Sequence, residues 1–341
     1  TPTPRRGGGG ASTASEAVRV VTLADVEDAA RALAGIVFRT PLLANADVDA
    51  ELGGRLLIKA ECAQRTGAFK LRGAYNRMRR LSAAERARGA ITYSSGNHAL
   101  GVALAGRLLN VSALIVMPSD VPPAKMAAVR ALGAEIATFE RDTESSDEVV
   151  ERLRARSGRI VVPPSADPRV LAGAGTAALE LVAQARELDA EPDIVLVPCG
   201  GGGLTAATAV VMDAVSPGTG VYAAEPELFD DTRRSLAAGH PVPNPKGRRT
   251  ICDSIMTPIP NDVTFPINRA LLAGGVVASD DAVRAAMRFA FERYKIVVEP
   301  GAAVGLAAVL SGDVDIRGRT VATIVTGGNV DPARFCALLA G

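Results

Sequence analysis

The sequence predicts an α/β fold in which parallel-rich sheets are flanked by helices and divided between two domains. From about residue 90 onward, short apolar runs alternate with segments of helical periodicity, which is typical of parallel strands joined by helical crossovers. The chain has 341 residues, of which 48% are hydrophobic, so it can bury one large core or two ordinary ones.

Ordered structure is predicted to begin with a helix at Thr22. The Thr22 side chain can cap this helix, Asp25 follows three residues later, and apolar residues recur at helical spacing until Gly35. A strand over residues 55–59 comes next. Residues 1–20 predict a disordered tail, in which the run Gly7–Gly10 is not a phosphate loop because it follows no strand. The tail has no apolar segment after its arginines, so no signal peptide is predicted.

Two series of alternating elements follow, and they define the predicted domains. The first has strands over 91–93, 113–117, 134–139 and 160–162, with helices over 97–109, 122–132 and 147–156. The second has helices over 175–188, 204–214, 280–293 and 302–310, with strands over 194–197, 221–224 and 320–325. We therefore expect a small mobile domain over 91–167, inserted into a large discontinuous domain formed by 21–90 and 168–341. Residues 163–168 are the expected crossover, and residues 239–266 receive no assignment.

The composition argues against several functional classes. Lys and Arg total 38 against 37 Asp and Glu, and Trp is absent, so neither a basic field nor a base-stacking surface for nucleic acid is expected. No run of about 18 apolar residues predicts a membrane span. The four cysteines, Cys62, Cys199, Cys252 and Cys336, form no CxxC pair, so a reduced, cytoplasmic setting is expected.

A glycine-rich loop follows the apolar strand that ends near Cys199. Gly200, Gly201, Gly202 and Gly203 lead into a helix that opens at Leu204. Glycines let backbone N–H groups converge on a phosphate, and the helix N-terminus adds partial positive charge. A tight turn without a ligand is the simpler interpretation, but four consecutive glycines maximise the freedom of the unfolded chain and are rarely used for a turn alone.

The same loop has a rival interpretation. Gly201, Gly203 and Ala206 fit a short dinucleotide-binding fingerprint, and Glu225 ends the next strand, where a ribose-binding acid is expected. This interpretation leaves Lys70 and the polar loop over residues 94–98 without a role.

Lys70 lies in the segment Thr66-Gly67-Ala68-Phe69-Lys70-Leu71-Arg72-Gly73-Ala74. A lone lysine is usually a solvated surface charge, but three other loops give this lysine significance. They are Ser94-Ser95-Gly96-Asn97-His98, the glycine loop and Thr326-Gly327-Gly328-Asn329-Val330-Asp331. A lysine amine, a polar loop, a phosphate-sized glycine loop and a hydroxyl are the parts needed to hold pyridoxal phosphate as a Schiff base.

The loop over residues 94–98 contains more hydrogen-bonding groups than a helix cap needs. One Ser or Asn suffices for capping, whereas a Ser-Ser-Gly-Asn cluster also suits a carboxylate or a ring oxygen. His98 is interpreted as a structural hydrogen bonder, and the other histidine, His240, lies beside a proline in a predicted loop. Neither a GxSxG nor an HExxH motif is present, so hydrolytic or zinc chemistry has little support.

An acidic turn follows the strand over residues 221–224. Glu225, Asp231 and the carbonyl of Phe229 could supply oxygen ligands to Mg²⁺ or Ca²⁺. The alternative is a helix start whose acidic residues are stabilised by the helix dipole.

Together these motifs resemble the fold-type II pyridoxal-phosphate enzymes, with a tryptophan-synthase-β-like fold, and specifically the serine/threonine dehydratase and serine racemase family. The resemblance covers the chain from about Thr22 to the C-terminus. It implies that Lys70 binds the cofactor covalently and acts as a base, that Phe69 packs beside the ring and that Asn97 bonds the 3′ oxygen. It further implies a phosphate site at Gly200–Gly203 and Leu204, a pyridine partner at Thr326, a substrate-carboxylate site at residues 94–98, and the cation site at Glu225, Phe229 and Asp231.

The resemblance implies a dehydratase, or ammonia-lyase, that converts threonine, serine or a 3-hydroxyaspartate-type substrate into a 2-oxo acid and ammonia. A racemase or a β-replacement enzyme of the same fold is the alternative, because Ser95 could return a proton to Cα on the face opposite Lys70. Departures from the family pattern leave the substrate open. Thr326 replaces the usual serine, Ala174 stands where relatives often have glutamine, and residues 250–254 replace a more usual Ala-Asp-Gly stretch. A homodimer is expected from the resemblance.

Overall fold

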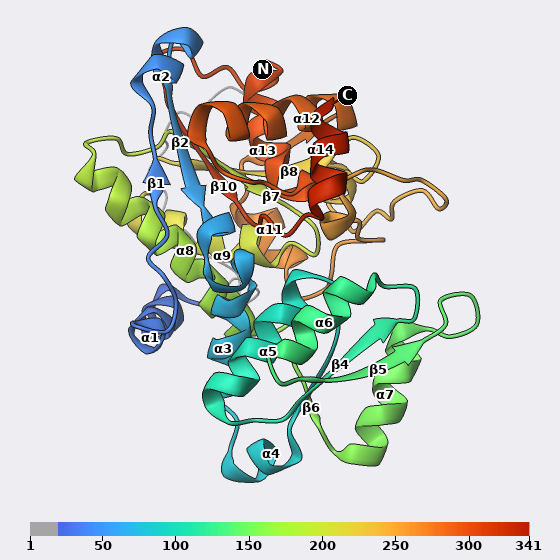
Figure 1. The fold of residues 1–341 in the computed structure, drawn as a ribbon. Coiled ribbons are helices and arrows are strands. Elements are labelled where there is room, and N and C mark those ends of the chain that lie inside the picture. The colour runs from blue at the N-terminus through green and yellow to red at the C-terminus, as the bar shows by residue number, and fades with distance from the viewer. Residues whose placement is uncertain (1–19, 341) are drawn as a thin grey trace.

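The larger of two sheets has six strands in the order β1-β2-β10-β7-β8-β9 in the computed structural model, which describes residues 20–340 (Figure 1). The strands are β1 (Leu42–Leu43), β2 (Arg55–Ala60), β10 (Thr320–Val325), β7 (Ile194–Pro198), β8 (Gly220–Pro226) and β9 (Gly274–Ala278). All neighbours are parallel except β1, which pairs antiparallel with β2. The predicted tail, including the run Gly7–Gly10, lies outside the described residues except for Val20.

The smaller sheet has four parallel strands in the order β5-β4-β3-β6. They are β5 (Glu135–Phe139), β4 (Ala113–Pro118), β3 (Ala90–Tyr93) and β6 (Ile160–Val161), accompanied by helices α5 (Asn97–Leu109), α6 (Pro123–Ala131) and α7 (Ser146–Ser157). Figure 1 shows this unit, in cyan and green, below the larger sheet. The predicted α/β class with parallel-rich sheets is confirmed.

Both faces of the larger sheet are covered by helices. On β2, Leu56 and Ile58 belong to one hydrophobic cluster and Leu57 to the other, because successive side chains of a strand point to opposite faces. The first cluster includes α12 (Asp280–Phe289), α13 (Pro300–Leu310) and α14 (Pro332–Ala340). The second includes α1 (Leu23–Leu33), α8 (Pro168–Glu187) and α9 (Gly203–Val215). A parallel sheet buried on both faces explains the nearly continuous apolar strands of the sequence.

Helix α3 (Lys70–Arg79) lies at the junction of the two units, where it packs against both α5 and α8. Its Leu71, Ala74 and Met78 belong to the apolar cluster of the smaller unit. Gly101 of α5 passes so close to the lysine that a Cβ there would lie 3.0 Å from the backbone carbon of Lys70. The division into domains at residues 90 and 168 remains a proposal. Helix α3, which begins with Lys70, contacts α5 in the proposed small domain and α8 in the proposed large domain.

Several elements differ from those predicted. Helix α8 begins at Pro168 rather than at residue 175, because Asp167 caps it and proline is favoured in the first turn. Helix α12 ends at Phe289 and a π-helical turn over Ala290–Tyr294 follows it. The sequence did not indicate α2 (Ala46–Leu52), α3, α4 (Ala83–Arg88), α11 (Phe265–Leu271), α14, β1 or β9. Helix α10 (Asp231–Ala238) begins where the sequence offered a helix start as one of two interpretations of the acidic turn.

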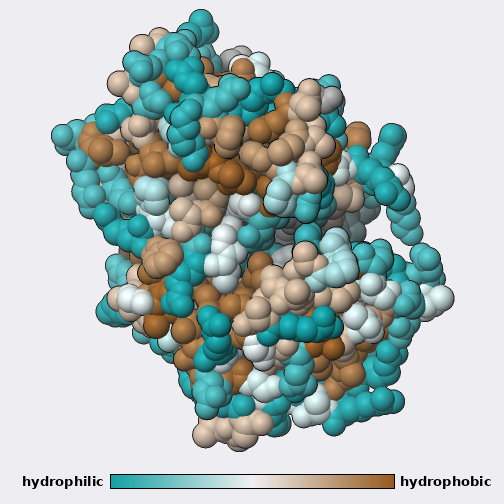
Figure 2. Space-filling model, in the orientation of Figure 1, coloured by the Kyte–Doolittle hydropathy of each residue, from teal (hydrophilic) through white to brown (hydrophobic). Residues whose placement is uncertain are grey.

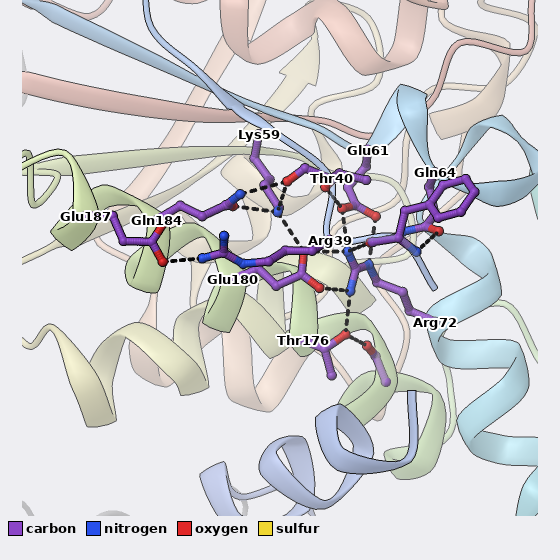
Figure 3. Close-up of polar contacts among 12 residues, drawn as sticks. Arg39, Thr40, Lys59, Glu61, Gln64, Arg72, Thr176, Glu180, Gln184 and Glu187 are labelled. Carbon is purple, nitrogen blue, oxygen red and sulfur yellow. Dashed lines mark hydrogen bonds and ion pairs between the residues drawn. The ribbon is translucent and has the colours of Figure 1, made fainter. Parts of the chain in front are cut away.

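A buried network of charges joins β2, α3 and α8 (Figure 3). Arg72 donates to both oxygens of Glu61, to Glu180 and to Thr176, at 2.7–3.1 Å. Lys59 donates to Glu180, Gln184 and the carbonyl of Thr40. Burial by itself raises the pKa of Glu61, but Arg72 and Lys59 hold it below its ordinary value. Two cations and two carboxylates thus fix the start of α3 against the larger sheet.

The surface is mixed rather than dominated by one kind of residue. Figure 2 shows hydrophilic and hydrophobic residues interspersed over the viewed face. None of the helices in the described part of the chain is long and apolar enough to cross a bilayer.

Candidate active site

Three of the predicted loops are joined by direct hydrogen bonds. The Phe69 amide donates to the carbonyl of Thr326 at 3.1 Å, and residues 68 and 327 form an isolated β-bridge. The Asn329 side chain donates to the carbonyl of Thr66 at 2.7 Å and to Oδ1 of Asn97 at 2.8 Å. The lysine segment, the polar loop at residues 94–98 and the loop after β10 therefore form one structure.

The glycine loop reaches the same place through the crossover at residues 164 and 165. Lys70 Nζ donates to the carbonyl of Pro164 at 3.0 Å. The next residue, Ser165, lies against the loop so closely that a Cβ at Gly201 would be 2.6 Å from its hydroxyl oxygen. All four predicted loops are consequently brought together.

Lys70 is the first residue of α3, and its amine has the lowered pKa that a nucleophile or base needs. Nζ lies 4.9 Å from the centre of the Phe69 ring. Burial lowers the pKa of Lys70 from 10.5 to about 8, although the negative charge of Glu299 opposes the shift. A lysine with a pKa near 8 has a substantial neutral fraction near neutral pH, as a nucleophile or base requires.

The glycine loop connects β7 to the N-terminus of α9. Gly202 has φ +73°, in the left-handed region that glycine adopts without strain, and Gly203 is the first residue of the helix. The buried Leu204 follows. Backbone amides at the N-terminus of a 13-residue helix form a site that suits a phosphate group. An amine of lowered pKa and an anion site on neighbouring loops fit pyridoxal phosphate.

Asn97 is held in a fixed orientation by two residues. Its Nδ2 donates to Oε1 of Glu299 at 2.6 Å, while its Oδ1 accepts from Asn329. Glu299 is buried at the start of α13, and burial raises its pKa to about 7. Glu299 accepts one of the two Nδ2 protons of Asn97, and Asn329 donates to its Oδ1. The second Nδ2 proton is therefore available to a ligand.

Glu299 is a site residue that the sequence reasoning missed. One signal could have revealed it: a single acid stands between the apolar residues 296–298 and the helix start at Pro300. An acid at such a position is expected to be buried and paired.

The loop at residues 94–98 leads into α5, which begins at Asn97 after Gly96. Ser94 Oγ accepts from the Gly96 amide at 3.2 Å. The buried His98 places Nε2 2.9 Å from the carbonyl of Val162, and burial lowers its pKa to about 3, so the ring is neutral. Because its side chain is used structurally, His98 can serve a substrate through its backbone, at a helix N-terminus suited to a carboxylate.

Thr326 directly follows the last residue of β10 and is buried. Its backbone bond to Phe69 places it beside the lysine segment, which is compatible with the predicted role as pyridine partner.

The acidic turn contains two buried carboxylates. Glu225, at the end of β8, accepts from the amides of Thr232 and Arg233 at 2.9 and 2.8 Å. Asp231 Oδ1 accepts from Asn244 at 2.6 Å, and its Oδ2 is buried without a hydrogen-bond partner among the described residues. Burial raises the pKa of Glu225 to about 8 and that of Asp231 to about 6.

The two interpretations of this turn are both visible in the geometry. Glu225 caps α10, as a helix start requires, whereas the unpartnered oxygen of Asp231 suits a cation. Within residues 20–340, no group of three or more His, Cys, Asp or Glu side chains is placed so that it could hold a metal ion, so a cation here would also need carbonyl or water ligands. The capping bonds leave Glu225 unsuited to the ribose-binding role of the dinucleotide interpretation.

Comparison with known proteins agrees with this geometry. The family described as "Pyridoxal-phosphate dependent enzyme" matches residues 33–327. An L-threo-3-hydroxyaspartate ammonia-lyase from Pseudomonas sp is 42% identical, covering 93% of this chain and 98% of the relative. A serine racemase from Oryza sativa subsp. indica is 36% identical, covering 96% of each chain. The solved structure of a T.th. threonine deaminase matches with a TM-score of 0.85 and 43% identity, covering 91% of this chain and 99% of that one.

The chain therefore belongs to the family of pyridoxal-phosphate-dependent enzymes, and the suspected fold-type II resemblance is confirmed. Its cofactor is pyridoxal phosphate. The individual roles of Lys70, Ser95, Asn97 and the other site residues stay predictions.

Proposed function

We infer that this enzyme is an ammonia-lyase of the threonine/serine type, which converts a β-hydroxy amino acid into a 2-oxo acid and ammonia. The observation that carries this function is the Lys70 amine, whose pKa is lowered to about 8 and which donates to the crossover that packs against the glycine loop. Relatives named as ammonia-lyases support the same reaction.

In the proposed reaction, Lys70 would hold the cofactor covalently through Nζ, and the glycine loop with Leu204 would bind the phosphate. When bound, pyridoxal phosphate withdraws electrons from the substrate Cα and so makes the Cα proton removable. Asn97 and Thr326 would orient the ring, and Phe69 would pack beside it. The amides and hydroxyls at residues 94–98 bind the substrate carboxylate.

Lys70 also moves the protons. Its amine, once free and neutral, accepts the Cα proton, and its lowered pKa makes this possible near pH 8. The β-hydroxyl would leave as water, taking the proton that Lys70 has accepted from Cα. Addition of water to the resulting enamine then gives the 2-oxo acid and ammonia, so that the atoms balance.

Among β-hydroxy amino acids, we propose one with a second carboxylate, of the 3-hydroxyaspartate type. Lys125 of α6 is exposed, and its charge acts to lower the pKa of the buried Glu299 of the site. A cation whose field reaches the site suits a second carboxylate. The relative named for 3-hydroxyaspartate supports this choice.

Lys70→Ala tests the reaction. It should abolish both 2-oxo acid production and the visible absorption of the bound cofactor, while Lys246→Ala, at an exposed lysine, should change neither. Undiminished production by Lys70→Ala would remove Lys70 from the mechanism.

A substrate panel tests the substrate. We expect a higher kcat/KM for L-threo-3-hydroxyaspartate than for L-threonine or L-serine, and Lys125→Met should raise KM for the first without changing the others. A preference for threonine or serine would refute the proposed substrate but not the lyase.

The presence of Ser95 supports racemisation as a second candidate activity. A hydroxyl across the substrate from Lys70 could return the Cα proton on the opposite face and give racemisation. Serine racemases among the relatives support this alternative. Measuring the D-amino acid beside the 2-oxo acid separates the two reactions.

Three finer features are proposed on the same basis. The Glu225–Asp231 turn, with the carbonyl of Phe229, binds Mg²⁺ or Ca²⁺, supported by the unpartnered Oδ2 of Asp231. The enzyme is a homodimer, which sedimentation would test. It resides in the cytoplasm, in line with four cysteines that are free in the structure.

A further inference from the structure

We propose that Asn261, Thr264 and Asn268 are positioning residues for the phosphate site, and that they act by orienting the peptide groups of the glycine loop. This inference rests on the proposed phosphate-binding role of that loop. It also gives a function to the end of the segment over residues 239–266, which the sequence pattern left unassigned.

The first contact is made at the carbonyl of Gly201. This oxygen accepts two hydrogen bonds, from Nδ2 of Asn261 at 2.9 Å and from Oγ1 of Thr264 at 2.8 Å. Thr264 is fully buried, so its hydroxyl has no water to bond instead. Two donors on one carbonyl fix the direction in which that carbonyl points.

The second contact is made at the carbonyl of Gly202. It accepts from Nδ2 of the buried Asn268 at 3.3 Å and from the Ala206 amide at 2.9 Å. The second of these bonds is the first turn of α9, so this carbonyl points into the helix.

Peptide geometry then decides where the amides point. In a trans peptide, the C=O of one residue and the N–H of the next point in opposite directions, and every described peptide bond is trans. Because the carbonyls of Gly201 and Gly202 point toward the polar side chains and into the helix, the amides of Gly202 and Gly203 point the other way. Those amides are the donors that an anion at this helix N-terminus would use.

The side chains of Asn268 and Thr264 pack so closely against Gly202 that no larger residue fits at this position. A Cβ at Gly202 would lie 2.5 Å from Nδ2 of Asn268 and 2.9 Å from the Thr264 hydroxyl. Gly202 is therefore required both by its positive φ and by the approach of these two side chains.

Asn261 also connects the phosphate end of the site to the lysine end. Its Nδ2 lies 3.1 Å from the hydroxyl of Ser165, the residue that follows Pro164. The Pro164 carbonyl accepts from Lys70. The Oδ1 atom of Asn261 accepts from the amides of residues 263 and 264, so the Asn261 side chain is itself held in place.

The test compares cofactor binding by variants of Thr264. Thr264→Val keeps the shape but removes the donor, and it should weaken binding of pyridoxal phosphate to the cofactor-free enzyme about tenfold. Binding of pyridoxal, which lacks the phosphate, should not change. Thr264→Ser restores the hydroxyl and should bind pyridoxal phosphate within about twofold of wild type. The ³¹P chemical shift of the bound cofactor should move in the valine variant alone.

Thr323→Val is the matched control. Thr323 is a buried threonine on β10 that donates to the carbonyl of Leu196 at 3.2 Å, so the control loses a comparable bond outside the loop. It should lower the melting temperature as Thr264→Val does and leave the affinity for pyridoxal phosphate unchanged. Should Thr264→Val not fold, Asn268→Leu must show the same loss for pyridoxal phosphate and not for pyridoxal.

Two results would overturn the inference. One is an unchanged affinity of Thr264→Val for pyridoxal phosphate, and the other is an equal loss of affinity for pyridoxal, which would indicate general damage. Wild-type enzyme that binds pyridoxal phosphate no more tightly than pyridoxal would instead refute the proposed phosphate site itself, and the inference with it.

Discussion

The reactivity of Lys70 toward its cofactor should depend on pH in a way that reveals the lowered pKa of its amine. Only the neutral amine attacks an aldehyde. With a pKa of about 8 instead of 10.5, the neutral fraction at pH 7.5 is roughly one quarter instead of roughly one in a thousand. Lys70 should therefore react at that pH about 200 times faster, per collision, than an ordinary lysine.

The assay follows the appearance of the visible band after pyridoxal phosphate is mixed with cofactor-free enzyme at several pH values. The rate should rise with pH and level off above about 8, because the amine is then mostly neutral. The reference is Nα-acetyl-lysine, whose rate should keep rising toward pH 10. A rate for the enzyme that also keeps rising to pH 10 would refute the lowered pKa of Lys70.

Glu299→Gln provides the second part of this test. The Glu299 carboxylate raises the pKa of Lys70, so its removal should shift the midpoint to lower pH. Because the pKa of Glu299 is itself about 7, the two enzymes should differ most above pH 7, where Glu299 is ionised in the wild type. Glu292→Gln, at an exposed acid, should leave the midpoint unchanged, and an unchanged midpoint in Glu299→Gln would show that the two groups are not coupled.

Three further predictions concern stability, the cation and Ser95. Arg72→Met should lower the free energy of unfolding by about 3–5 kcal/mol, because it leaves the buried Glu61 carboxylate without its cationic partner, whereas Arg317→Ala, at an exposed ion pair, should change stability far less by denaturant unfolding. Added Ca²⁺ or Mg²⁺ should raise the melting temperature of chelator-treated wild type but not of Asp231→Asn, and an equal response of both proteins would favour the helix-start interpretation. Ser95→Ala should abolish any racemisation and retain 2-oxo acid production; continued racemisation would exclude Ser95 as the second acid.

Much of the fold followed from local patterns. The capping box at Thr22, the helix over 97–109 and the strand over 320–325 were predicted at their observed bounds, because each is specified by capping residues or by periodicity within its own segment. The helix at Pro168 was placed too late because proline was interpreted as part of a crossover. A proline in the first turn and a proline in a loop look alike until the capping bonds of Asp167 are known.

The loops of the candidate site were also readable in the sequence. The glycine run, the Ser-Ser-Gly-Asn cluster and Lys70 are each unusual over a few residues, so their chemistry could be inferred before their positions were known.

The sequence by itself determined the α/β class and the order of the four loops, and it predicted Lys70 as the amine that the chemistry needs. Only the tertiary structure decided what surrounds them: Glu299 lies 202 residues from its partner Asn97, and Glu180 lies 108 residues from Arg72. No sequence motif contains Glu299, Thr264 or Asn268. Each is a buried residue whose proposed role comes from a hydrogen bond to a group in another segment. A hydrogen bond depends on distance in space, and the spacing of residues along the chain does not specify that distance.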